Sequence, residues 1–238
     1  MPLHSIQLLP SGACLGLWHL QEAPADLWPQ LPNPVPYRPL LPATTDLTRQ
    51  AQWLAGRVLV HELLAGLQAA GAAAFPTPLW LTNDPNGRPQ LVGWPQAAVS
   101  LSHSGAWVAA LLAPGGRVGI DVELVRDKAR RLAGRFLSDA ELVAAQKSAD
   151  PAVFSLLWSV KETLYKLAGQ RGLIFREDIL IDLSYPHFPA LTTGELPATL
   201  CQANDQTRHR VCYAEPAPGY VLTYCYELNF SAPTPLSL

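Results

Sequence analysis

Two acidic residues separated by one position are the first candidates for chemistry in this sequence. Asp121 and Glu123 lie in the segment GIDVE, whose alternating pattern predicts a strand. Side chains on a strand alternate between faces, so both carboxylates would lie on one side, about 7 Å apart. They would repel each other there, and a bound Mg²⁺ with oxygen ligands would relieve the repulsion. An exposed edge strand with solvated acids is the alternative.

A second charged group lies in LLWSVKETLYKLAG (156–169), which has the apolar pattern of a helix. Glu162 and Lys166 are one turn apart, and Lys161 flanks them. They could form an ion pair on a wet surface, worth a few tenths of a kcal/mol. They could also work together, with Glu162 as a third metal ligand or a base and both ammonium groups neutralising phosphate oxygens.

Polar residues also interrupt a strand pair at Ser102, His103 and Ser104. Neighbouring residues on a strand face opposite ways, so neither serine is well placed to use His103 as a base, and no GxSxG elbow is present. A polar clasp for an anionic ligand fits these residues better than serine catalysis does. A structural histidine at a strand bend fits them as well as the clasp. Arg88, in the turn NGRP, adds a cation nearby in the sequence.

The elements that position these residues alternate between strands and helices. Strands are expected as pairs within 5–20, 79–94 and 98–113, and singly at 117–125, 178–184, 196–202, 208–214 and 219–229. Helices are expected from Asp46 to about 70, over 127–136, from a Ser138–Glu141 capping box, and from Asp150 to near Gly169 or Gly172.

This order predicts an α+β fold. We expect a pseudo-two-fold duplication of two subdomains, 1–113 and 114–238, each a small antiparallel sheet on a long helix, with the site in the cleft between them. The proline-dense run 24–42 is expected to be an extended surface connection.

Composition narrows the class of protein further. The 238 residues are 49% hydrophobic and carry a net charge of −2, which argues against nucleic-acid binding. No apolar run is long enough for a membrane span, and no signal pattern opens the chain. The four cysteines lack metal-binding spacing, so we expect free thiols in a cytoplasmic protein.

Four motifs in fixed order then give a resemblance. The segments GRP (87–89), SLSHSG (100–105), VGIDVE (118–123) and WSVKETLYKL (158–167) resemble the signatures of the 4′-phosphopantetheinyl transferases, of the two-halved, surfactin-synthetase-activating type. RQAQWLAGR (49–57) looks like the basic N-terminal helix of that family. Arg88 replaces the usual lysine and Thr163 the usual alanine, and the residues before 46 match poorly.

The resemblance implies a monomeric holo-[acyl-carrier-protein] synthase that moves the 4′-phosphopantetheine of coenzyme A to a serine of an apo acyl or peptidyl carrier protein and releases 3′,5′-ADP. It implies Mg²⁺ held by Asp121, Glu123 and Glu162. Catalysis would fall to Glu162 as base and to Lys166 and Lys161, which would face the cleft, on the pyrophosphate. The implied coenzyme A contacts are Arg49, Arg57, Arg88, Ser102, His103, Asp121, Lys161 and Lys166.

A carrier protein would dock its acidic helix beside residues 127–147, near the basic run RDKARRLAGR (126–135), which could equally be a solvated helix face. Two other functions fit the acidic residues. One is a different Mg²⁺-dependent phosphoryl-transfer or nucleotide-hydrolysing enzyme, which would need no carrier. The other is a silent coenzyme A-binding or carrier-binding protein, but the presence of Asp121, Glu162 and Lys166 argues against it.

Overall fold

The structure is a computed structural model, and it describes residues 2–10, 12–71, 78–184, 193–202 and 205–227. The chain is α+β, as the sequence predicts. The first half contains β1 (Leu3–Leu8), β2 (Cys14–His19), α1 (Pro24–Leu27), η1 (Trp28–Gln30), η2 (Val35–Leu40), α2 (Leu47–Ala69), β3 (Trp80–Asn83), β4 (Pro89–Val92), β5 (Ala98–Ser104) and β6 (Trp107–Ala113). The second half contains β7 (Arg117–Leu124), α3 (Asp127–Phe136), α4 (Asp139–Gln146), α5 (Ala152–Ala168), α6 (Phe175–Asp178), β8 (Ile179–Ile181), β9 (Thr193–Gln202), β10 (Asp205–Ala214) and β11 (Tyr220–Glu227).

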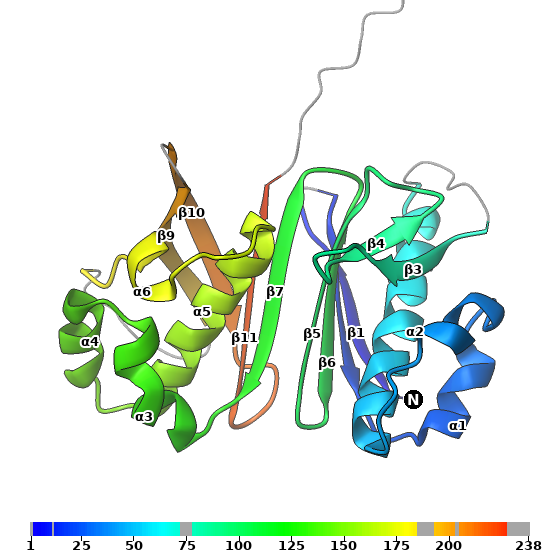
Figure 1. Cartoon of the computed structure of the whole chain (residues 1–238), viewed down its shortest axis with the longest axis horizontal. Helices are drawn as coiled ribbons and strands as arrows, with labels where there is room; N and C mark the ends of the chain where they lie inside the picture. The colour runs from blue at the N-terminus through cyan, green and yellow to red at the C-terminus, as the bar shows by residue number, and fades with distance from the viewer. Residues whose placement is uncertain (1, 11, 72–77, 185–192, 203–204, 228–238) are drawn as a thin grey trace, which may run out of the picture.

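Two antiparallel sheets form the centre of the molecule. The first has the strand order β1-β2-β6-β5 and the second β7-β11-β10-β9-β8, while β3 and β4 form a separate hairpin. Helix α2 packs on the first sheet and α5 on the second, so each long helix covers an outer face (Figure 1). The first sheet comes from residues before 114 and the second from residues after it. A duplication, and the independence of the two parts as subdomains, stay predictions.

The two sheets pack against each other through their inner faces. A buried cluster there includes Leu15 of β2, Leu111 of β6, and Ile120 and Val122 of β7. Strands β5 and β7 lie side by side at the edge of this layer (Figure 1). We call the line along which they meet the seam. The apolar residues of β7 anchor it in this core, and its alternate residues Asp121 and Glu123 are therefore presented along the seam.

Local signals explain where the two long helices begin and end. The carboxylate of Asp46 accepts from the backbone N–H groups of Thr48 and Arg49, at 2.9 and 3.2 Å, and so caps α2 as predicted. For α5 the N-cap is Pro151, one residue later than predicted, and the side chain of Asp150 accepts from the N–H of Ala152 at 2.8 Å. Helix α5 ends where Gly169 adopts a φ of 66°, a conformation that favours glycine.

Helix α4 begins with the capping box predicted from Ser138 and Glu141. The Ser138 hydroxyl accepts from the Glu141 N–H at 3.3 Å, and the Glu141 carboxylate accepts from the Ser138 N–H at 2.7 Å. The expectation of an extended chain over 24–42 is wrong, because α1, η1 and η2 occupy most of it. Prolines at the starts of such short helical turns lose no hydrogen bond, and the fully buried Tyr37 anchors the last of them.

Smaller differences concern the last strands. Strand β8 is shorter than predicted, β9 and β10 begin three residues earlier, and α6 was not predicted. Residues 228 and 229 of the last predicted strand lie outside the described residues. The four cysteines are free, as expected. Among the helices that the structure describes, none combines the length and the apolar character needed to cross a membrane.

Candidate active site

The acidic pair of β7 occupies the seam between the sheets. Asp121 is 3% exposed and Glu123 is partly buried, while Val122 between them is fully buried in the core between the sheets. Both carboxylates therefore lie on the face of β7 opposite to its apolar residues, as the alternation predicts. The pair does not sit on an exposed edge strand, because β11 flanks β7 on one side and β5 lies along the other.

Asp121 has two donors on one oxygen and none on the other. The Lys166 ammonium donates to Oδ1 at 2.7 Å and also to the backbone oxygen of Ile120 at 2.9 Å, and the Ser102 hydroxyl donates to Oδ1 at 2.8 Å. The buried Oδ2 has no hydrogen-bond partner within the part of the chain that the structure describes. An unpartnered buried carboxylate oxygen is costly, so this atom marks a place for a cation or a donor from a ligand.

Glu162 lies one turn before Lys166 on α5, close enough for the charges of both β7 acids to affect its pKa. Burial raises the pKa of Glu162 to about 7; Lys166 opposes this rise, and the negative charges of Asp121 and Glu123 add to it. The pKa of Glu123 is also raised, by burial and by Asp121, against the opposing effects of its neighbours. Ionisation of both glutamates is therefore disfavoured where they lie near Asp121.

The three carboxylates are not arranged as a complete set of metal ligands in this structure. Across the described ranges, no group of three or more His, Cys, Asp or Glu side chains is arranged to hold a metal ion. The donor set still suits a hard divalent cation, because it offers oxygen atoms only, one of them an unpartnered buried oxygen of Asp121. Burial is the main cause of the raised pKa values of Glu123 and Glu162, and a cation there would offset the further rise that comes from the neighbouring carboxylates.

Lys161 does not face this region, and the expectation that it does is wrong. Its side chain is fully buried on the other side of α5, where the ammonium donates to Glu141 Oε2 at 2.8 Å and to the backbone oxygens of Phe175 and Ile179 at 2.8 and 2.5 Å. Glu141 in turn accepts from the N–H of Ile181 at 2.6 Å. The physical reason is that Glu162 lies about 40° around the helix from Lys166, whereas Lys161 lies about 140° from it and so points away from the seam.

His103, on β5, lies near two cations, Lys166 and Arg49. Partial desolvation and the positive charges of Lys166 and Arg49 lower the pKa of His103. Arg49, in the first turn of α2, is exposed, as is His103. Ser102 was expected among the ligand contacts, but in this structure its hydroxyl is bonded to Asp121. The arrangement produces an electropositive region beside an acidic one.

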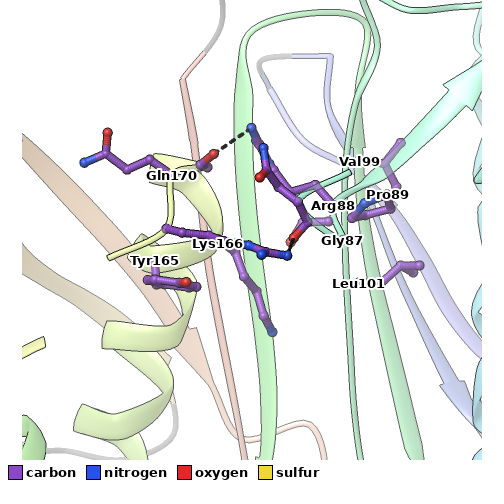
Figure 2. Close-up of a pocket in the computed structure, with 12 residues that line it drawn as sticks. Gly87, Arg88, Pro89, Val99, Leu101, Tyr165, Lys166 and Gln170 are labelled. Carbon is purple, nitrogen blue, oxygen red and sulfur yellow. Dashed lines mark hydrogen bonds between the residues drawn. The ribbon is translucent and has the colours of Figure 1, made fainter. Parts of the chain in front are cut away.

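Arg88 belongs to a pocket between the β3–β4 turn and the end of α5. Its Nη1 donates to the backbone oxygen of Gly169 at 3.3 Å, and Lys166 lines the same pocket (Figure 2). A second bond crosses here, from Arg171 to the backbone oxygen of Asn86 at 2.9 Å. Cationic side chains from both halves of the sequence therefore line one concave surface.

Arg57 lines a neighbouring pocket together with Ser102 and His103. Its guanidinium stacks 3.6 Å from the centre of the Trp53 ring and donates to the Trp53 backbone oxygen at 3.1 Å. Burial lowers the pKa of Arg57 to about 10. Its Nε is buried without a hydrogen-bond partner among the described residues, so this arginine has donor capacity that its own surroundings do not use.

The sequence did not predict the hydrogen-bond and ion-pair partners of Glu123 and Glu141. Trp158 and Ser104 donate to the two oxygens of Glu123, and Glu141 pairs with Lys161. The spacing of Ser104 two residues after Ser102 was a usable signal, since both must face the same side of β5. The capping box identified Glu141 but gave no indication that its carboxylate is buried.

The fold and this region define a class: an α+β protein of two packed sheets with acidic and cationic side chains together at the seam. Clustered cations beside carboxylates suit a phosphate ligand with a divalent cation. Comparisons with known proteins identify a family that this chain resembles. The model of the 4′-phosphopantetheinyl transferase superfamily matches residues 117–225. The chain is 33% identical over 150 residues to 4′-phosphopantetheinyl transferase AcpT of Salmonella typhi, covering 58% of this chain and 67% of AcpT.

A second relative is 4′-phosphopantetheinyl transferase Sfp of Bacillus subtilis (strain 168). It is 30% identical over 145 residues, which cover 58% of this chain and 59% of Sfp. The chain belongs to the 4′-phosphopantetheinyl transferase superfamily.

Proposed function

We propose that this protein transfers the 4′-phosphopantetheine group of coenzyme A to a serine of an apo acyl or peptidyl carrier protein and releases 3′,5′-ADP. The observation that carries the proposal is the joint presence at the seam of Glu162, the acidic pair of β7 and the Lys166–Asp121 ion pair of 2.7 Å. The relatives named 4′-phosphopantetheinyl transferase support it. We also propose that the protein acts as a cytoplasmic monomer.

Coenzyme A is assigned to the surface that crosses from one half of the chain to the other. Its pyrophosphate would lie beside Lys166, and its nucleotide beside Arg49, Arg57, Arg88 and His103. Ser102 would contribute after its hydroxyl turns from Asp121, or indirectly through that bond. On this assignment residues 1–113 provide the nucleotide side and 114–238 the acidic side. The charges of the two pockets support it, because phosphates are bound by clustered cations and hydrogen-bond donors.

We assign a divalent cation, Mg²⁺ by its preference for carboxylate oxygens, to Asp121, Glu123 and Glu162. The unpartnered buried Oδ2 of Asp121 and the raised pKa values of both glutamates support that assignment. Such an ion supplies charge neutralisation to a pyrophosphate whose bridging bond breaks. Asp121 would keep its ion pair with Lys166. Lys161 has no part in this site, because its ammonium is fully engaged elsewhere.

Glu162 takes the proton in this proposal. The carrier serine oxygen forms a bond to the β-phosphorus, which bears pantetheine, while the bond from that phosphorus to the oxygen of 3′,5′-ADP breaks. The serine proton passes to the Glu162 carboxylate, directly or through a water. An ionised carboxylate at this position is a suitable general base at neutral pH. Lys166 would stabilise the negative charge that grows on the leaving phosphate.

The carrier protein is proposed to dock on the basic helix α3. Arg126, Lys128, Arg130, Arg131 and Arg135 are all exposed there. Arg126 and Lys128 line a pocket that also reaches Glu123 and Trp158, so a carrier held by α3 would lie next to the acidic site. One ion pair, from Arg131 to Asp127 at 2.9 Å, partly engages this surface already. An acidic helix would complement the remaining positive charge.

The experiment that tests this function follows 3′,5′-ADP release by chromatography, with and without an apo carrier protein, in the presence of coenzyme A and MgCl₂. Transfer predicts release that depends on the apo carrier and stops when its target serine is replaced by alanine. A nucleotide-hydrolysing enzyme would release product without any carrier. A silent binding protein would release none with any of several acyl and peptidyl carriers tried.

A further inference from the structure

Three serines on one face of β5 connect it to β7. Ser100, Ser102 and Ser104 are two residues apart, so their hydroxyls point the same way. Ser100 Oγ accepts from the N–H of Ile120 at 3.1 Å, and Ser104 Oγ accepts from the N–H of Leu124 at 3.1 Å. The two strands belong to different sheets, so these hydroxyls take the place of ladder hydrogen bonds across the seam.

Two of the three serines also donate to the acids. Ser102 donates to Asp121, as described, and Ser104 donates to Oε2 of Glu123 at 3.1 Å. Ser100 contacts neither carboxylate in the hydrogen bonds described. The serine face therefore contains two functions that can be separated: all three residues hold the seam, but only Ser102 and Ser104 contact the acidic pair.

Glu123 is held from both sides by neutral donors. The indole Nε1–H of Trp158, on α5, donates to Oε1 at 3.0 Å, opposite the Ser104 hydroxyl on Oε2. Trp158 is itself fixed by edge-on packing against Phe136, with ring centres 5.1 Å apart. Two neutral donors fix the orientation of the carboxylate without cancelling its charge. Asp121, by contrast, is paired with the Lys166 ammonium.

We infer that Ser104 is a positioning residue for Glu123, which it holds from the opposite sheet in the orientation needed to bind the divalent cation. The inference rests on the proposed function for the identity of that ion. Ser104 lies outside the segment 117–225 that matches the superfamily model, so the first half of the chain completes an acidic site whose acids all come from the second half. Outer donors of this kind typically change metal affinity by about 10- to 100-fold when removed.

The test compares Ser104→Ala with Ser100→Ala in the full chain. Ser100 shares the face and the seam but contacts no acid, so its substitution reports the cost of loosening the seam alone. Mn²⁺ is titrated into each protein at a fixed concentration of coenzyme A, and free Mn²⁺ is measured by electron paramagnetic resonance. We expect Ser104→Ala to weaken Mn²⁺ binding by about tenfold or more. Ser100→Ala should stay within about twofold of wild type, and Ser104→Thr, which keeps a hydroxyl, should restore most of the affinity.

Equal effects of the two alanine substitutions, or unchanged Mn²⁺ affinity in Ser104→Ala, would overturn the inference, as would a wild-type protein that does not bind Mn²⁺. If Ser104→Ala does not fold, Trp158→Phe provides the second variant. It removes the donor to Oε1 and keeps an aromatic ring, and it should also weaken Mn²⁺ binding by about tenfold. No carrier protein is used, so this result is independent of whether the protein transfers phosphopantetheine.

Discussion

Lys166 Nζ lies 2.7 Å from Oδ1 of Asp121, and this ion pair joins the last turn of α5 to the middle of β7. Lys161, five residues earlier on the same helix, makes an ion pair of similar length, 2.8 Å, with Glu141 on the far side. The two lysines look alike in the sequence, but only Lys166 faces the seam. Their different partners lead to opposite expectations for substitution.

Lys161→Met should destabilise the fold by about 3–5 kcal/mol, because it leaves the Glu141 carboxylate buried without its cation. The double variant Lys161→Met/Glu141→Gln removes that charge and should recover much of the loss. Transfer by the folded double variant should be close to wild type. Urea unfolding and the transfer assay measure the two effects separately.

Lys166→Met/Asp121→Asn is the matched pair on the other face of α5. It also removes an ion pair, in which Asp121 is buried and Lys166 partly exposed. Transfer should fall by about 10²–10³-fold even where the protein is folded, because a proposed metal ligand and the ammonium that acts on phosphate are both gone. If the Lys161 double variant lost as much transfer per folded molecule as this one, Lys161 would have to act on the site after all.

Gly119 permits the close approach of α5 to β7. A Cβ atom on Gly119 would overlap the backbone oxygen of Thr163, which belongs to the turn of α5 that carries Glu162. Gly119→Ala should therefore push the helix from the strand, lowering both the thermal midpoint and the rate of transfer. Gly134→Ala on α3 is the control, since nothing lies within 4 Å of its Cβ, and it should stabilise the protein by up to about 1 kcal/mol. Wild-type stability and activity in Gly119→Ala would show that the helix does not depend on this contact.

Much of this arrangement could be predicted from local sequence signals. The long helices, their caps and the paired strands follow from apolar periodicity, from Asp46 and from Gly169, all of which act within a few residues. The face of β7 that presents Asp121 and Glu123 follows from alternation alone. Such signals are strong because they do not depend on the rest of the fold.

The parts that could not be predicted depend on distant partners. Nothing near Lys161 indicates that Glu141 and two backbone oxygens surround it, because α4 and α6 come from separate segments. The helical turns within 24–42 depend on the burial of Tyr37, whose hydroxyl accepts from the N–H of Leu81, 44 residues away. The donors to Glu123 likewise come from β5 and α5. Tertiary packing decides each of these.

The raised pKa of Glu162 predicts how stability depends on pH in metal-free protein. The folded state holds the Glu162 proton up to about pH 7, whereas the unfolded chain releases it near the ordinary value of 4.5. Between these values the folded state binds more protons, so this group's contribution to the free energy of unfolding decreases as pH rises from about 4.5 to about 7. Glu162→Gln should reduce that decrease, as measured by urea unfolding at pH 5 and pH 8.

Added MgCl₂ is the control for this pH effect. It should stabilise wild type at pH 8 more than it stabilises Glu162→Gln, because a bound cation favours the ionised carboxylate. An identical pH dependence in the two proteins would mean that Glu162 is not held in the surroundings described for it.

The proposed function requires the acids at the seam to perform transfer to a carrier protein. The most direct test is the intact mass of an apo carrier protein after incubation with coenzyme A, MgCl₂ and either wild type or Glu162→Gln. We predict that wild type adds one phosphopantetheine to the carrier, that an excess of EDTA prevents this, and that folded Glu162→Gln adds none. Undiminished modification of the carrier by Glu162→Gln, or no modification of any of several acyl and peptidyl carriers by wild type, would contradict the account.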